Sequence, residues 1–239
     1  FNIKTLPDED IDTIKQTLQE DIDNLLDKDP IRTFYSYDRS ITYKRGCNQA
    51  NVVDSALKRN GILRDSSLYF GYGMNVATVT LHISKPDDVH YKQVLSDVDY
   101  VPKTAGMHFD PKGGTMKIIM YLKHITSDDG PFTYIPDSHR WVNYPADRLS
   151  AKANCTGTYL DNDNARKTFM NLPPVCRKTS IFGTVTDDSS NLSKSLLEAE
   201  QSFTSDIGNT IVFDPGMIHR GGICNTGTRI SLQIAIRKK

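Results

Sequence analysis

Three separated pieces of the chain carry residue types that together could bind a metal ion and an anionic co-substrate. His108-Phe-Asp110 offers an imidazole and a carboxylate two residues apart, and His219 offers a second imidazole far downstream. Two histidines and one carboxylate form the facial triad of non-haem Fe(II) sites, which leaves coordination positions open. Arg229 follows His219 by ten residues, and its planar guanidinium could pair with a carboxylate of a co-substrate. The set predicts an iron- and 2-oxoglutarate-dependent oxygenase.

The His-x-Asp pattern is weak evidence when it is taken alone. Six histidines in a chain with 25 Asp among 239 residues give about 0.6 matches by chance, and one match is present. A surface histidine near a solvated aspartate is therefore an adequate alternative. The residues around the pattern have to decide between the two interpretations.

The surroundings of His108 and Asp110 favour a short strand. Residues i and i+2 of a strand point to the same face, so both side chains could bind one metal ion. Gly106 precedes them and residues 111–114 (PKGG) follow them, which bounds a short extended segment. This geometry is what a metal site on a strand requires.

A second segment near the C-terminus predicts a hairpin. Residues 224–227 (CNTG) are typical of a turn, and residues 228–237 alternate between apolar and polar side chains. A hairpin centred on this turn would place His219 opposite Ser231, with Arg229 on the same face. A slip of one residue would reverse that facing. The alternative is an ordinary amphipathic hairpin with a solvated polar face.

Three motifs, in this order, resemble those of the phytanoyl-CoA dioxygenase-like family. Residues 130–140 (GPFTYIPDSHR) are similar to its GPL-x-x-x-PGSH-K/R signature, and residues 206–219 are similar to its approach to the second iron histidine. Residues 219–229 (HRGGICNTGTR) resemble its H-G-S-x-x-N-x-S-x-x-R pattern. The resemblance covers roughly residues 104–237.

The resemblance implies a mainly β fold, a double-stranded β-helix (jelly roll, cupin-like), with flanking N-terminal helices. It implies Fe(II) bound by His108, Asp110 and His219. It further implies that Arg229 holds the far carboxylate of 2-oxoglutarate, with the Ser231 hydroxyl as a helper.

Two positions inside residues 130–140 need separate comment. Asp137 stands where the family signature has glycine, a residue that usually serves a special backbone conformation. The family motif shapes a turn beside the pocket, so we interpret His139 as a structural histidine. We expect no iron ligand there.

The expected reaction is hydroxylation of a small-molecule metabolite or natural-product intermediate, with O₂ consumed and succinate and CO₂ released. Related halogenases carry a small residue in place of Asp110, so its presence favours hydroxylation. Three alternatives stay open: a demethylase of the same cofactor class, a non-oxidative cupin-like metal protein (isomerase or sensor), and a jelly roll that only binds ligands. The DNA-repair branch typically has a second arginine where this chain has Ala235.

Composition and charge limit the partners. Lys plus Arg equals Asp plus Glu, so no bulk charge recruits nucleic acid or an acidic membrane. No apolar run is long enough for a transmembrane helix, and no secretory signal pattern is present, so we expect a cytoplasmic protein. A small molecule is the expected partner, and the sequence leaves the oligomeric state open.

The whole chain, 1–239, is expected to form a single oxygenase domain. A helical and extended N-terminal part, 1–70, precedes a jelly-roll core at about 74–237. Periodicity predicts helices at 7–26 and 51–60, an extended segment at 31–44, and strands at 74–83 and 117–123. The polar segment 141–205 is typical of a lid or binding loop.

Overall fold

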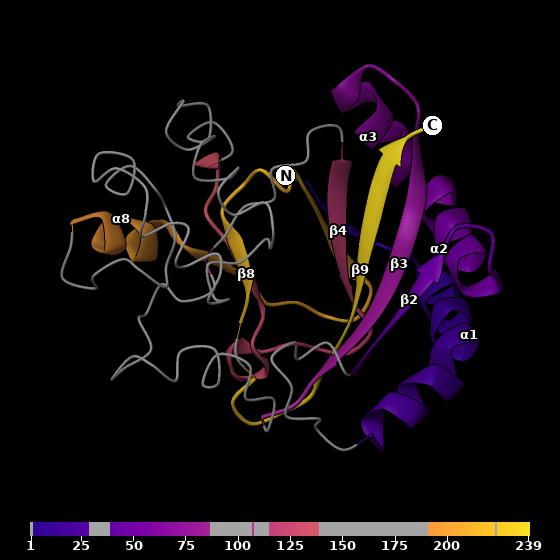
Figure 1. Ribbon diagram of the computed structural model, residues 1–239, viewed down its shortest axis with the longest axis horizontal. Helices are drawn as coiled ribbons and strands as arrows, with labels where there is room; N and C mark the ends of the chain where they lie inside the picture. Colours follow the sequence, from indigo (N-terminus) through magenta and orange to yellow (C-terminus); the bar gives the residue numbers. More distant parts are fainter. Residues whose placement is uncertain (1, 29–38, 87–106, 108–114, 139–190, 223) are drawn as a thin grey trace, which may run out of the picture.

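Two antiparallel sheets pack against each other in the computed structural model, and helices cover the outer face of the larger sheet (Figure 1). The structure describes residues 2–28, 39–86, 107, 115–138, 191–222 and 224–239. The described part is mainly β with flanking N-terminal helices, which confirms the predicted fold class.

The larger sheet has six strands and the smaller has three. The order in the larger sheet is β1 (Asn2–Thr5), β7 (Asn209–Phe213), β4 (Thr115–Tyr121), β9 (Arg229–Lys238), β3 (Met74–Ser84) and β2 (Ser40–Lys44). The order in the smaller sheet is β6 (Gln201–Phe203), β5 (Phe132–Tyr134) and β8 (His219–Gly221). Every neighbouring pair of these strands is antiparallel.

The outer face of the larger sheet is apolar because its strands alternate. In β9, Leu232, Ile234 and Ile236 are fully buried and pack in one core cluster with the N-terminal helices. These helices are α1 (Asp8–Leu26), α2 (Asn48–Arg59) and α3 (Ile62–Phe70). The buried apolar residues of α1 recur every three or four positions, so a single stripe faces the sheet: Ile11, Ile14, Leu18, Ile22 and Leu25.

A buried carboxylate joins α1 to α2. Asp10 is 4% exposed and receives hydrogen bonds from Arg59 and from the Asn60 side chain, the latter at 2.6 Å. Burial alone would raise the pKa of Asp10, but the bonds from Arg59 and Asn60 outweigh it and lower the pKa. The carboxylate therefore stays charged and ties the two helices together.

The space between the sheets holds a second, largely aromatic core. Its members from β4, β5, β6 and β7 include Tyr121, Phe132, Phe203 and Phe213. The Tyr121 hydroxyl, on the larger sheet, accepts a hydrogen bond of 2.8 Å from the backbone N–H of Phe132, on the smaller one. This bond and the ring contacts fix the distance between the two sheets.

Most predicted elements appear with shifted ends. The helix predicted at 7–26 and the strand predicted at 74–83 are confirmed as α1 and β3, the helix at 51–60 begins at Asn48, and the strand at 117–123 lies two residues earlier as β4. The described end of the extended segment 31–44 forms β2. The sequence did not predict six further elements: β1, α3, β5, β6, β7 and α8 (Asn191–Ala199). Of the segment 141–205, only α8, β6 and their flanks are described.

Candidate functional site

The predicted site residues divide into two groups. His219, Arg229 and Ser231 belong to the described part of the chain. The predicted ligands His108 and Asp110 lie outside the described residues, as does His139. Met107, which directly precedes His108 in the sequence, is described and is 3% exposed.

His219 is held in one orientation. It begins β8, is 5% exposed, and contacts the rings of Phe132 and Phe213 at centroid distances of 5.7 and 5.0 Å. Its Nδ1 lies 2.6 Å from the carbonyl oxygen of Met217. Because a carbonyl only accepts, Nδ1 carries a proton, and in the neutral ring the lone pair then lies on Nε2. A histidine arranged in this way is ready to bind a metal through Nε2.

The positions next to both predicted histidine ligands pack together. Met107 and Ile218 belong to one small buried cluster with Ile135 and Leu196. Met107 precedes His108 and Ile218 precedes His219. The residues that precede the two predicted histidine ligands in the sequence are therefore members of the same buried cluster.

Arg229 spans the gap between the two sheets. It begins β9 in the larger sheet and donates to the Gly222 carbonyl at 3.1 Å, just beyond β8. It also donates to the Ser84 hydroxyl at 2.9 Å, from the paired position on β3. The guanidinium is thus fixed by one contact on the side of each sheet. On the β8 side the contacted residue, Gly222, follows His219 by three residues in the chain.

The predicted hairpin register is wrong. β8 pairs with β5, where His219 lies opposite Tyr134, whereas Ser231 of β9 lies between His82 and Tyr121. The two segments belong to different sheets, because the turn between them crosses the space between the layers. The long side chain of Arg229 nevertheless reaches the end of β8, where it donates to the Gly222 carbonyl.

Close backbone approach holds the end of β8 against residues 130–131. A Cβ atom on Gly222 would lie 2.6 Å from the carbonyl oxygen of Pro131 and 2.8 Å from the carbonyl carbon of Gly130. The Gly222 N–H donates to that Pro131 oxygen at 3.0 Å. Only glycine fits at this close approach. The approach brings the family-like motifs at 130–140 and 219–229 together in space.

Ser231 shares the inner face of β9 with Arg229 and is 7% exposed. Its neighbour across the strand pair is His82, a residue that no sequence motif singled out. Nε2 of His82 lies 3.2 Å from the Gln233 side-chain oxygen. Burial, and then the positive charge of Arg229, lower the pKa of His82 to about 4. The histidine is therefore neutral near pH 7 and adds no second positive charge beside Arg229.

His82 and Ser84 could have been found from the sequence. Both lie on β3 two residues apart, on the face opposite to the buried Leu81 and Ile83. Alternation in a strand places such polar residues on the inner face once the apolar face is known to be covered. The strand itself was predicted, but its two faces were not assigned.

A His82→Gln variant should reduce the pH dependence of stability. The folded-state pKa of His82 is about 4 and the unfolded value about 6.5, so the unfolded state binds more protons between these values. Stability is lost as the pH falls through this window, by at most about 3 kcal/mol. Urea unfolding of both proteins at pH 7 and pH 5 measures the effect. Equal losses of stability from pH 7 to pH 5 in the wild type and in His82→Gln would contradict the lowered pKa of His82.

Asp137 adopts the backbone conformation that the family's glycine would serve. Its φ is 59°, in the left-handed region, and it is the one non-glycine residue with positive φ in the described part of the chain. An aspartate there carries a steric cost that glycine avoids. Aspartate in place of the signature's glycine therefore preserves the turn but strains its backbone.

Asp137→Gly should stabilise the protein by about 1 kcal/mol, since relief of left-handed strain exceeds the extra unfolded-state freedom of glycine. The measurement is the urea midpoint of unfolding at constant m-value. Asp128→Gly, at an exposed position in the 3-10 turn Ser127–Asp129, serves as the control and should not stabilise. An unchanged or lower midpoint for Asp137→Gly would mean that the aspartate side chain supports the turn.

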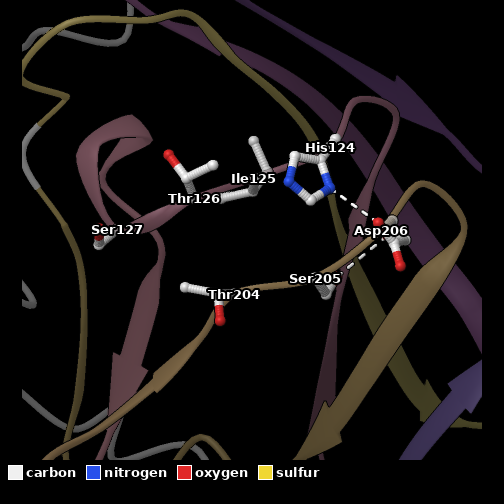
Figure 2. Close-up of a pocket in the computed structure, with 7 residues that line it drawn as sticks. All are labelled: His124, Ile125, Thr126, Ser127, Thr204, Ser205 and Asp206. Atoms are coloured by element: carbon white, nitrogen blue, oxygen red, sulfur yellow. Dashed lines mark hydrogen bonds and ion pairs between the residues drawn. The ribbon is translucent and has the colours of Figure 1, made fainter.

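A surface hollow of about 440 Å³ lies elsewhere, between residues 124–127 and 204–206 (Figure 2). Figure 2 shows His124 pointing to Asp206, with Nδ1 2.8 Å from its carboxylate. None of the predicted site residues lines it. Within the described ranges no three His, Cys, Asp or Glu side chains form a metal-binding group, and two of the predicted ligands fall outside those ranges. Among described helices, none is long and apolar enough to cross a membrane.

Comparison with protein families gives one match across nearly the whole chain. The model of the phytanoyl-CoA dioxygenase (PhyH) family matches residues 5–230. A sequence comparison with functionally curated proteins gives no significant match.

Solved structures share the fold at low sequence identity. AviO1 from Streptomyces viridochromogenes Tue57 has a TM-score of 0.53 at 12% identity, covering 98% of this chain and 86% of its own. SnoK, a non-haem α-ketoglutarate-dependent carbocyclase from nogalamycin biosynthesis, has a TM-score of 0.53 at 10% identity, covering 99% of this chain and 79% of its own. HygX from Streptomyces hygroscopicus, with nickel and 2-oxoglutarate bound, has a TM-score of 0.51 at 11% identity, covering 99% of this chain and 82% of its own.

Proposed function

We propose, because the chain belongs to the phytanoyl-CoA dioxygenase family, that it hydroxylates a small-molecule metabolite or natural-product intermediate. Family membership assigns Fe(II) and 2-oxoglutarate as cofactor and co-substrate, with O₂ as the oxidant. When bound, they supply the oxidising chemistry, in which 2-oxoglutarate becomes succinate and CO₂ and one oxygen atom passes to the substrate. The residues 5–230 of the family match support a single domain.

The observation that carries the proposal is the geometry of His219. Its Nδ1–H is bonded to the Met217 carbonyl, which leaves Nε2 as the coordinating nitrogen, and Met107, the residue before His108 in the sequence, shares a buried cluster with Ile218, the residue before His219. Two imidazoles and one carboxylate are the donor set that Fe(II) takes in oxygenases of this kind. His108, Asp110 and His219 are the proposed ligands.

Arg229 supplies the second half of the site. The Gly222 carbonyl and Ser84 hydroxyl hold its guanidinium between the sheets, where it is half-buried, and neutral His82 lies beside it. A fixed guanidinium in a partly dehydrated space binds a carboxylate through two parallel hydrogen bonds. We assign the far carboxylate of 2-oxoglutarate to Arg229, with Ser231 on the same face as the helper.

The walls around His219 would exclude water. Phe132 and Phe213 contact its ring, and both are almost fully buried. A dry surround strengthens the charge pairing of a bound anion and protects a reactive centre from side reactions. The protein's own contribution to hydroxylation is then to orient the ligands and the substrate and to keep water out.

An anaerobic titration tests the function. Metal-free protein receives Fe(II) and then 2-oxoglutarate, and the visible charge-transfer absorption is recorded. We expect a band that requires both components, after which a screen of candidate substrates is scored by succinate release. Iron that binds without giving the band would favour the non-oxidative cupin-like alternative and would remove the role of Arg229.

A further inference from the structure

Ser138 interrupts the pairing of two strands immediately before His219. Beyond the pair Tyr134–His219, the next residues along the chain are Ile135, just after β5, and Ile218, just before β8. The Ile135 N–H donates directly to the Ile218 carbonyl at 2.9 Å. The return bond is replaced by a hydroxyl: the Ile218 N–H donates to Ser138 Oγ at 2.7 Å, and this hydroxyl donates to the Ile135 carbonyl at 2.7 Å.

The peptide held by Ser138 is the one that holds the imidazole. The Ile218 N–H and the Met217 carbonyl belong to the same peptide group, and that carbonyl accepts from Nδ1 of His219. Four groups are therefore joined in one directional chain, from the imidazole N–H through the peptide and the hydroxyl to the Ile135 carbonyl. Hydrogen bonds in such a chain polarise one another and fix one another's orientation.

The chain is rigid because it is buried. Ser138 is 0% exposed, and Ile135 and Ile218 are 1% and 0% exposed. A buried N–H without an acceptor costs about 1–3 kcal/mol, so the Ile218 peptide keeps its plane as long as the hydroxyl is present. The left-handed turn at Asp137 delivers Ser138 to this position.

We propose that Ser138 is a positioning residue for the metal ligand His219. Through the Met217–Ile218 peptide its hydroxyl aims the imidazole and keeps the proton on Nδ1, so that Nε2 is presented to the metal. The inference rests on the proposed function, since it needs His219 as a ligand. Supporting hydrogen bonds of this kind typically change metal affinity about 10- to 100-fold.

Ser67 provides a matched control. Its hydroxyl makes the same two kinds of bond, donating to the Leu63 carbonyl at 2.6 Å and accepting from the Met74 N–H at 2.9 Å. It joins α3 to β3 and contributes nothing to β8. Ser67→Ala therefore removes an equivalent bridge without touching the peptide before His219.

The test is a titration of metal-free protein with Co(II), followed by its visible absorption, alongside urea unfolding of each variant. For Ser138→Ala we expect a Co(II) dissociation constant about 10- to 100-fold above wild type and an altered spectrum. Ser67→Ala should lose similar stability but bind Co(II) as wild type does. Ser138→Thr, which keeps the hydroxyl, should restore the affinity to within about 3-fold.

Each outcome decides between the two claims. Equal Co(II) affinity and spectrum in wild type and Ser138→Ala would overturn the positioning role alone. A wild-type protein that binds no Co(II) would overturn the metal centre, and the inference with it. If Ser138→Ala does not fold, Ser138→Cys replaces it, because the thiol fills the volume and is a weak donor and acceptor. Wild-type affinity in Ser138→Cys would then overturn the role.

Discussion

Arg229→Ala should raise the dissociation constant for 2-oxoglutarate by a factor between about 30 and several thousand. Truncating one partner of a desolvated charge pair costs about 2–5 kcal/mol, which corresponds to this range. Arg229 is held by Gly222 and Ser84, so little reorganisation precedes binding in the native protein. Isothermal titration of 2-oxoglutarate into the anaerobic Fe(II) or Co(II) protein measures the change, and metal affinity itself should stay within a few-fold.

Arg237→Ala is the matched control for this experiment. Arg237 is the same residue type on the same strand, but it is exposed near the end of β9. Its truncation should leave 2-oxoglutarate affinity unchanged. Arg229→Lys should recover part of the affinity, because the charge remains and the planar fork is lost. Unchanged affinity in Arg229→Ala would rule out the carboxylate assignment.

His219→Ala should abolish tight metal binding and, with it, oxidation of any substrate. A facial triad that loses one imidazole loses a metal bond, a larger loss than the ~100-fold typical of removing a supporting hydrogen bond. The variant also leaves space between the rings of Phe132 and Phe213, so its folding must be checked by circular dichroism and urea unfolding. Metal content after dialysis against a weak chelator gives the readout.

His124→Ala controls for the loss of a histidine elsewhere. The His124 side chain is 62% exposed and pairs with Asp206 on the surface, so its removal should leave metal content unchanged. Asp110→Ala should reproduce the loss seen in His219→Ala, because both residues are proposed ligands of one ion. Stoichiometric iron in His219→Ala, with normal folding, would show that the metal binds elsewhere.

The sequence alone determined those helices and strands whose apolar residues recur with a regular period. The stripe in α1 and the alternation in β3 and β9 follow local periodicity, which depends on the residues of a single segment. The motifs at 130–140 and 219–229 were sufficient for the family, and the family implied the fold class. Residue type and spacing were also sufficient to single out His219 and Arg229.

Tertiary structure decided how those pieces face one another. The hairpin prediction failed because a turn such as 224–227 fixes no sheet partner, and β8 and β9 entered different sheets. Strand pairing depends on contacts between residues far apart in the chain, which local alternation does not encode.

The residues that support the site were likewise decided by the tertiary structure and not by local sequence. Ser138 and His82 act through neighbours about 80 and 150 residues away, at Ile218 and Gln233. A single sequence presents them as an ordinary serine in a turn and an ordinary histidine in a strand. Their roles arise only when packing buries them and supplies a specific partner, because burial makes each hydrogen bond obligatory. Residue types and spacing identified the candidate chemistry; the packing of the two sheets decided which side chains orient it.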